Sequence, residues 1–236
     1  MFINGFDILW DEVDDYVADI QSIRSIEQLT FSKPVTFFCG ENGSGKSTLL
    51  EALAIKNGLN PEGGTRNYNF STYDSYSDMH NHMRLWRSRK PDWMYFLRAE
   101  SFYNVATKEM EYSGVFSERY HDQSHGQSFF SVLMKQTNKN GLYLLDEPEA
   151  ALSCQNQLAL LYLIQSCVKQ NCQFIIATHS PILLGFPGAQ ILSFDEDKVE
   201  EVDYKSTSSY QTMKLFLDRY DYFVKDIQEN NEGGIL

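Results

Sequence analysis

The sequence lacks any apolar run that approaches the length of a membrane-spanning helix. Its N-terminus, Met-Phe-Ile-Asn-Gly-Phe-Asp, also lacks the charged and then apolar segments that are typical of a signal peptide. These two absences predict a cytoplasmic protein with no membrane insertion. With 236 residues, of which 42% are hydrophobic, the chain is long enough to bury the core of one large α/β domain or of two small ones.

Cysteine is scarce, and its spacing excludes two common uses. Four cysteines stand at positions 39, 154, 167 and 172, and no two of them form a C-x-x-C pair. Neither a disulfide framework nor a zinc site follows from this spacing. His80 and His82 stand close together, but two histidines without further ligands nearby are more often surface residues than a metal site.

Positive charge is also in short supply. The chain has 20 Lys and Arg residues against 32 Asp and Glu residues, a net charge of −12 at pH 7. Because phosphate backbones need local positive charge, this balance does not support DNA as a general partner. One basic segment runs against it, made of Arg84, Arg87, Arg89 and Lys90 around Trp86. A nucleic-acid or partner contact stays open there, but we favour the solvated face of a helix that Pro91 ends.

No internal repeat, heptad run or low-complexity linker divides the chain, so we predict a single domain over residues 1–236. Apolar runs predict strands, and apolar residues at helical spacing predict the helices between them. The expected strands are residues 2–10, 34–39, 92–98, 141–147 and 172–180, with a terminal hairpin at 190–204. The expected helices are residues 47–56, 79–91 and 155–169, with one or two more at 207–228 over the sheet.

Strands that alternate with helices indicate a mostly parallel sheet, which presents polar residues at the carboxyl ends of its strands. Asp146 and Glu147 end one expected strand, and His179 ends another. Together with Lys46, these side chains should gather at one edge of the sheet.

The stretch from Gly40 to Thr48, Gly-Glu-Asn-Gly-Ser-Gly-Lys-Ser-Thr, fits the phosphate-binding pattern G-x-x-x-x-G-K-[ST]. Its glycines let backbone N–H groups point at an anion, and the N-terminus of the following helix favours negative charge. Lys46 can reach the β- and γ-phosphates of ATP, and the Ser47 hydroxyl can ligate Mg²⁺. The expected nucleotide-binding residues of the loop are Asn42, Gly43, Ser44, Gly45, Lys46, Ser47 and Thr48.

Four further segments follow in an order and spacing that resemble those of ATP-binding-cassette (ABC) ATPases. They are a Walker B-like strand from Leu142 to Glu147, a D-loop-like Glu149 to Ser153, a signature-like Gln123 to Ser128, and an H-loop-like Ala177 to Ser180. Within that superfamily the chain looks most similar to stand-alone bacterial "AAA family ATPase" proteins of the RecF- and SMC-like branch. The forms Glu-Asn-Gly-Ser-Gly-Lys-Ser-Thr and Thr-His-Ser-Pro favour that branch over transporters.

The resemblance implies an α/β fold, a P-loop NTPase of the ABC type. Its mostly parallel sheet would be flanked by helices, with a small antiparallel N-terminal part and a short helical subdomain inserted at about residues 60–138. In such proteins two copies sandwich two ATP molecules, with the phosphate loop of one copy facing the signature motif of the other. A homodimer that forms on ATP binding is therefore expected.

The resemblance also implies roles for single residues. Lys46 and Ser47 would bind phosphate and Mg²⁺, and Asp146 would hold Mg²⁺. Glu147 would polarise the attacking water, and His179 would contact the γ-phosphate. The residues expected to act on the nucleotide of the other copy are Ser124, Gly126 and Gln127.

Two positions depart from the family's pattern. No glutamine follows the strand that ends near Arg98, where relatives carry one that contacts Mg²⁺, and Glu100 is the candidate substitute as a metal ligand. His125 replaces the first glycine of the signature, and Gln123 replaces its leucine. A bulkier side chain there would reshape the contact with the other copy, so we expect weak hydrolysis without a partner.

Three functions remain open at this point. The favoured one is a dimerising ATPase switch that drives or regulates a partner protein of unknown identity, in a process such as DNA repair or phage defence. The second is the ATPase subunit of an ABC transporter, and the third is a regulatory module that senses ATP without hydrolysing it. The missing glutamine argues against the second, and the presence of Glu147 argues against the third.

Overall fold

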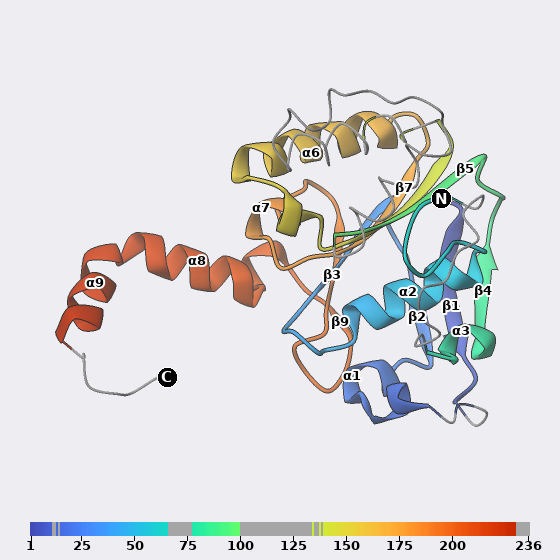
Figure 1. The fold of residues 1–236 in the computed structure, drawn as a ribbon, viewed down its shortest axis with the longest axis horizontal. Coiled ribbons are helices and arrows are strands. Elements are labelled where there is room, and N and C mark those ends of the chain that lie inside the picture. The colour runs from blue at the N-terminus through green and yellow to red at the C-terminus, as the bar shows by residue number, and fades with distance from the viewer. Residues whose placement is uncertain are drawn as a thin grey trace.

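The computed structural model describes residues 1–10, 13, 15–65, 77–99, 134, 137 and 139–229. Two β-sheets organise them (Figure 1). The larger sheet has the strand order β5-β6-β7-β3-β8-β9, and its neighbours are parallel except for the β8–β9 pair. Its strands are β5 (Trp93–Arg98), β6 (Gly141–Asp146), β7 (Gln173–Ala177), β3 (Val35–Cys39), β8 (Gln190–Ser193) and β9 (Glu200–Glu201). The expected parallel sheet and terminal hairpin are confirmed.

The central strands are buried on both faces. In β6, Leu142 and Leu144 belong to one apolar core, while Tyr143 and Leu145 belong to the other. All six residues of this strand are buried. This explains why β6 is a continuous apolar run rather than an alternating one, as is typical of parallel strands covered on both sides.

Helices supply the two covering layers. Helix α2 (Lys46–Lys56) packs on β6 and β7 from one side, and α6 (Cys154–Val168) and α7 (Pro181–Leu184) cover the other side. Helix α6 begins where the Ser153 side chain accepts a hydrogen bond from the Asn156 N–H. Its buried Leu160, Ile164 and Cys167 follow one another at helical spacing, which places them on the face toward the sheet.

The smaller sheet confirms the expected antiparallel N-terminal part. It has the order β2-β1-β4, with β1 (Ile3–Ile8), β2 (Gln28–Thr30) and β4 (Met83–Arg87), and η2 (Tyr16–Asp19) and α1 (Gln21–Arg24) lie between β1 and β2 in the chain. A buried glutamine of β7, Gln173, joins the two sheets. Its Oε1 accepts from the N–H groups of Phe2 (2.6 Å) and Ile3 (3.0 Å), and its Nε2 donates to the Ile3 carbonyl (2.8 Å).

The expected helix at 79–91 is wrong beyond its first turn. Helix α3 (Met79–His82) is short, and the chain then continues as β4 along β1. Trp86 explains the preference: it lies over Gly5, where a Cβ would come within 2.8 Å of the indole, and its Nε1 donates to Asp7 Oδ1 at 2.5 Å. A partner distant in the sequence has overridden the local helical pattern.

The basic residues of this segment also have contacts within the chain. Arg87 Nη2 donates to Asn57 Oδ1 at 3.1 Å, and the Arg89 guanidinium lies 4.5 Å from the centre of the Phe2 ring. The segment is therefore an edge strand, β4, and the residues after it, with side chains that contact the rest of the chain. It is not the solvated face of a helix that we favoured.

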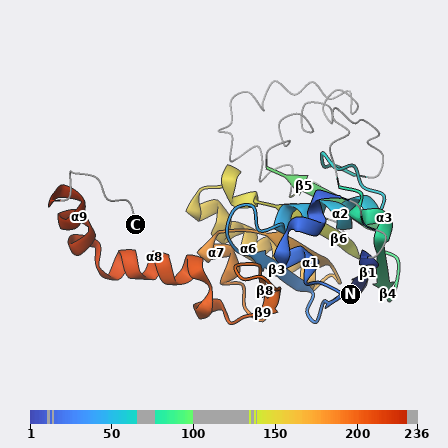
Figure 2. The same cartoon turned by 90° about the horizontal axis from the view of Figure 1, so that it is seen from below.

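The C-terminal helices are present but not where we expected them. Helices α8 (Ser208–Asp218) and α9 (Tyr220–Glu229) follow η5 (Tyr204–Ser206) and extend away from the body instead of covering the sheet (Figures 1 and 2). Helix α8 contains no buried residue. Helices α2, α6 and α7 pack on the two faces of the sheet, and α8 meets the body at α7 and η5.

Two further expectations concern the inserted helical subdomain and membrane-spanning helices. Most of the helical subdomain expected at about residues 60–138 lies outside the described residues, so the division of the single domain stays a prediction. Among the helices in the described part of the chain, none is long and apolar enough to cross a membrane.

Candidate nucleotide site

The phosphate loop links β3 to α2 and has glycine where its geometry needs glycine. Gly43 and Gly45 have φ of 81° and 89°, in the region that favours glycine. A Cβ on Gly45 would lie 2.5 Å from Ile23, whereas a Cβ on Gly43 would meet nothing within 4 Å. Gly45 thus allows α1 to pack closely against the loop, and the space beside Gly43 is open. No side chain caps α2, so the N–H groups of its first turn are available to an anion.

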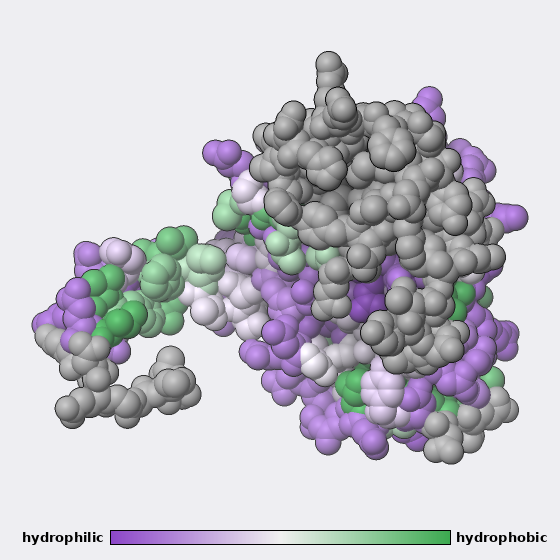
Figure 3. Space-filling view, in the orientation of Figure 1, coloured by the Kyte–Doolittle hydropathy of each residue, from purple (hydrophilic) through white to green (hydrophobic). Residues whose placement is uncertain are grey.

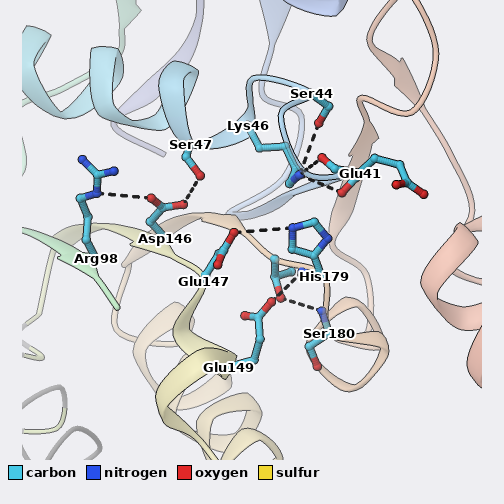
Figure 4. Close-up of polar contacts among 12 residues, drawn as sticks. Glu41, Ser44, Lys46, Ser47, Arg98, Asp146, Glu147, Glu149, His179 and Ser180 are labelled. Carbon is cyan, nitrogen blue, oxygen red and sulfur yellow. Dashed lines mark hydrogen bonds and ion pairs between the residues drawn. The ribbon is translucent and has the colours of Figure 1, made fainter. Parts of the chain in front are cut away.

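Lys46 is almost fully buried at the start of α2. Its Nζ donates to the carbonyl oxygens of Gly40 (2.8 Å) and Glu41 (2.6 Å) and lies 3.3 Å from Ser44 Oγ (Figure 4). Burial lowers the pKa of Lys46, and the nearby carboxylate of Glu147 acts in the opposite direction. These hydrogen-bond partners are uncharged, so the ammonium group has no direct carboxylate contact and suits an anionic phosphate.

Ser47 and Asp146 meet beside the loop. Ser47 Oγ donates to Asp146 Oδ1 at 2.8 Å, although the two residues are 99 positions apart in the chain. Both oxygens are hard ligands of the kind that Mg²⁺ takes, and Mg²⁺ commonly takes its remaining ligands from waters and substrate phosphates. No group of three His, Cys, Asp or Glu side chains within the described ranges could hold a metal by itself. The pair therefore fits Mg²⁺ bound together with a nucleotide.

Arg98 and Glu51 extend this pair into an ionic network that our sequence reasoning missed. Arg98 Nε lies 3.5 Å from Asp146 Oδ2, and its Nη1 pairs with Glu51 Oε2. Burial raises the pKa of Glu51, and the Arg98 charge opposes that shift. Arg98 is the register partner of Asp146 in the parallel β5–β6 pair. The only sequence feature that could have identified Arg98 as a site residue was its place at the end of an expected strand.

Glu147 and His179 face each other across the ends of β6 and β7. Glu147 Oε1 lies 3.6 Å from His179 Nε2, and their side chains are 39% and 35% exposed, so water can reach both. Glu147 has a left-handed backbone (φ 48°, ψ 50°), which its N–H stabilises by donating to the Ala177 carbonyl at 2.9 Å. Non-glycine residues held in this region cluster at functional sites.

Glu149 is a second residue that we did not single out. It lies in η4 (Pro148–Ala151), and its Oε1 accepts a hydrogen bond of 2.6 Å from the His179 N–H. Its other oxygen is buried without a hydrogen-bond partner. The D-loop-like segment begins at this residue, and that was the only sequence signal for it.

The structure brings five predicted site residues to one edge of the large sheet, namely Lys46, Ser47, Asp146, Glu147 and His179 (Figure 4). Glu100 and the signature residues Ser124, Gly126 and Gln127 lie outside the described residues, so their placement stays a prediction. His80 and His82 lie in α3, which contacts α2. His80 Nδ1 is 3.0 Å from the Ser77 carbonyl, and His82 Nε2 is 3.3 Å from Asp78.

Comparison with known proteins agrees with this geometry. A family model for an AAA domain matches residues 18–75, which include the phosphate loop, and one for an AAA ATPase domain matches residues 125–184, which include Asp146, Glu147 and His179. An uncharacterized ABC transporter ATP-binding protein of Haemophilus influenzae is 28% identical over 183 residues, or 66% of this chain and 68% of that protein. The chain is therefore similar to ATPases of the AAA and ABC types.

Two of the solved structures that resemble this chain are an ABC transporter component and an SMC head domain. One is cbiO1 of Clostridium perfringens, part of the ABC transporter complex cbiONQ, at 16% identity and a TM-score of 0.48 over 95% of this chain and 100% of that one. Another is the SMC head domain of Thermotoga maritima, at 14% identity and a TM-score of 0.42 over 74% and 92%. Both TM-scores are below 0.5, so the fold rests on the strand order and the phosphate loop, and the RecF- and SMC-like branch stays a prediction.

Proposed function

We propose that this chain is a Mg²⁺-dependent ATPase that works as an ATP-sandwich dimer, a switch that drives or regulates a partner protein. The observation that carries the proposal is the convergence of Lys46, Ser47, Asp146, Glu147 and His179 on one edge of the sheet. Two of these come from the first fifth of the chain and three from strand ends about a hundred residues later. Their convergence has a chemical rationale in nucleotide hydrolysis.

Binding is assigned to the loop and its two oxygen ligands. Lys46 and the free N–H groups of α2 would hold the phosphates, since both present positive charge at the same place. Ser47 and Asp146 would hold Mg²⁺, which when bound neutralises charge on the phosphate oxygens. Arg98 would keep the Asp146 carboxylate aimed at Ser47, because it contacts the oxygen that Ser47 does not use.

Hydrolysis is assigned to Glu147, with His179 beside it. Phosphoryl transfer needs a positioned water and stabilised charge more than it needs covalent help. Glu147 would accept a hydrogen bond from the attacking water, and the 3.6 Å to His179 sets where that carboxylate lies. Both side chains are more than a third exposed, so a second surface is needed to exclude bulk water. The signature residues Ser124, Gly126 and Gln127 of a second copy are the proposed source of that surface.

For the biological process we propose only a general class, DNA repair or phage defence. DNA repair and phage defence follow from the resemblance to the RecF- and SMC-like branch. The net charge of −12 favours a protein over DNA as the direct partner.

A transporter subunit is the second candidate, because the Haemophilus influenzae relative is named as an ABC transporter ATP-binding protein. Such a subunit would co-purify with a membrane protein from its own cells under mild detergent. Purification without any membrane protein would contradict this candidate and leave the switch in place.

The mass in solution of Glu147→Gln, measured by light scattering with and without Mg-ATP, tests the switch. We expect a monomer that becomes a dimer only with Mg-ATP, because ATP stays bound when the water is no longer activated. Lys46→Ala is the matched control and should stay monomeric, since it loses the phosphate contact. No change in mass with ATP demonstrably bound would overturn the dimer.

Turnover of the wild-type protein separates the switch from a non-hydrolysing sensor. We expect Mg²⁺-dependent phosphate release that falls by about 10²–10⁴-fold in Glu147→Gln, the usual contribution of a positioned acid or base. Equal release by the two proteins would remove Glu147 from the mechanism. Absence of release in both, even at concentrations where the dimer forms, would favour the sensor.

A further inference from the structure

Helices α8 and α9 form an arm, residues 208–229, whose base is tied to the nucleotide site. The Tyr204 hydroxyl donates to the carbonyl of Pro181 at 2.9 Å, and Pro181 follows His179 by two residues. The Tyr204 ring also contacts Tyr210 in the first turns of α8, with 4.7 Å between ring centres. The arm therefore begins on the same segment that carries His179.

The arm exposes apolar side chains that have no place in the body. None of the residues of α8 is buried, and apolar residues show as green patches along the arm in Figure 3. The exposed residues are Met213, Leu215, Phe216, Leu217, Tyr220, Tyr222 and Ile227. Scattered exposed apolar residues are ordinary, but a contiguous group on one projecting element marks an interaction surface.

A cavity of about 1010 Å³ connects the arm to the nucleotide site. One wall is the phosphate loop and the catalytic edge, from Gly40 to Asn42 with Glu147, Glu149 and His179, and the other wall is the arm. The arm's contribution to the wall is Ser208, Ser209, Thr212, Met213, Leu215, Phe216 and Phe223.

Three residues that line this cavity each have one polar atom that is buried inside the described part of the chain and makes no hydrogen bond there. These atoms are Glu149 Oε2, Ser209 Oγ and His179 Nε2, the last lying 3.6 Å from Glu147, beyond hydrogen-bond reach. The cavity thus joins polar side chains of the catalytic edge to apolar side chains of the arm. An occupant of the cavity would contact both.

We propose that a second copy of this chain is that occupant, and that the arm clamps it across the nucleotide site in the ATP-bound dimer. This rests on the proposed function, which places a second copy against the same catalytic edge. Any surface that covers Glu147 and His179 from that side also meets the arm, because one continuous cavity joins them. The two-fold symmetry of a homodimer then sets two arms against two bodies, doubling each contact.

Charge disfavours nucleic acid and anionic membranes as the occupant, and composition favours a protein. Nucleic acid and anionic membranes would need basic groups, whereas the chain has a net charge of −12 and the arm's share of the wall carries no charged residue. Aromatic and methionine side chains are enriched in protein–protein interfaces. Since the base of the arm is bonded to the His179 segment, loading of nucleotide and seating of the arm become linked steps.

The test compares two neighbouring residues of α8 in the Glu147→Gln background. Phe216 lines the cavity, whereas Leu217 does not and is more exposed, at 65% against 40%. We expect Phe216→Glu to weaken Mg-ATP-dependent dimerisation at least about tenfold and Leu217→Glu less than about threefold, because interface energy concentrates in a few central side chains. Light scattering over a concentration series gives the dimer affinity. Neither residue is buried, but Phe216 packs against Tyr220 and Phe223 of α9, so circular dichroism should first show that Phe216→Glu keeps its helices.

Three outcomes would overturn the clamp. One is dimerisation of Phe216→Glu as tight as in the parent, and another is an equal loss in both variants. The third is weaker ATP binding by Phe216→Glu under conditions where the protein is monomeric, which would make the cavity part of the chain's own nucleotide site. In each case the parent Glu147→Gln still dimerises, whereas failure of the proposed function appears as a parent that binds ATP and stays monomeric.

Discussion

Strand β6, which ends at the nucleotide edge, and the α8–α9 arm are both rich in leucine and aromatic residues, yet only β6 is packed within the described chain. Every residue of β6 is buried, and no residue of α8 is. The strand lies between two helical layers, while the arm projects beyond all of them (Figure 2). An apolar sequence therefore indicates that a segment needs a partner, without indicating whether the same chain provides it.

The polar groups differ in the same way. On the side of the edge where Ser47 lies, Ser47, Asp146, Arg98 and Glu51 form an unbroken series of contacts. On the side that faces the arm, Glu149 has one buried oxygen without a partner. One side of the site is complete within the chain, and the other is built to receive something.

The sharpest test of this comparison measures stability in the two regions with the same substitution. Leu144→Ala should lower the free energy of unfolding by about 2–5 kcal/mol, because it opens a cavity in a close-packed core. Leu217→Ala should change it by less than about 0.5 kcal/mol, since that side chain is mostly exposed. Urea denaturation followed by circular dichroism provides both values. Equal losses would break the comparison, because the arm would then belong to the folded core.

The ionic network gives a smaller effect on stability. Arg98→Met should lower the free energy of unfolding by about 2 kcal/mol, because it leaves the mostly buried carboxylates of Glu51 and Asp146 without their cation. Adding Glu51→Gln should recover part of the loss by removing one of the two like charges. If the double variant is less stable than Arg98→Met alone, Glu51 has a stabilising role outside this network.

Glu149 tests whether the side facing the arm positions the catalytic edge. Glu149→Ala should lower kcat by about tenfold and leave KM for ATP nearly unchanged, since it releases the His179 backbone without touching the phosphate loop. Glu149→Gln keeps a side-chain oxygen that can accept the same hydrogen bond and should restore most of the rate. A change in KM with unchanged kcat would instead assign Glu149 to nucleotide binding.

Cysteine reactivity gives the test with the smallest expected effect, since it requires no substitution. Burial raises the pKa values of Cys39 and Cys167 to about 11, so their thiolates are rare at neutral pH, whereas Cys154 is exposed. Iodoacetamide at pH 8 should label Cys154 quickly and the other three only after denaturation, as mass spectrometry would show. Both folded-state pKa values exceed the unfolded value of 9.0, so these thiols favour the folded state below pH 9 and lose that contribution as the pH rises toward 11. Fast labelling of Cys39 at pH 8 would contradict the burial of β3.

Local patterns were sufficient for the centre of the fold. Strand β3, the phosphate loop and α2 are consecutive in the chain, so their residues specify the motif without help from elsewhere. Strands β6 and β7 are short apolar runs that end in polar residues, and the parallel arrangement brings those ends together. The meeting of Lys46 with Asp146 and His179 at one edge followed from that rule.

The wrong helix after Met79 and the two residues that were missed have one physical cause, which is contact between segments far apart in the sequence. The segment after Met79 carries a helical pattern, but β1 offered it a strand partner and Gly5 made room for Trp86. Arg98 became a neighbour of Asp146 only through the β5–β6 register. Glu149 became a neighbour of His179 only because two strands end side by side.

The residues alone predict nucleotide chemistry, since a glycine loop, a lysine and two carboxylates at strand ends have few other uses. The course of the C-terminal helices and the unpaired Glu149 oxygen could be seen only in the folded chain. Helical periodicity in the sequence indicates that α8 has an apolar face. The free energy of burying that face depends on which surfaces remain uncovered after the sheet is packed. Those surfaces exist only once the whole chain has folded.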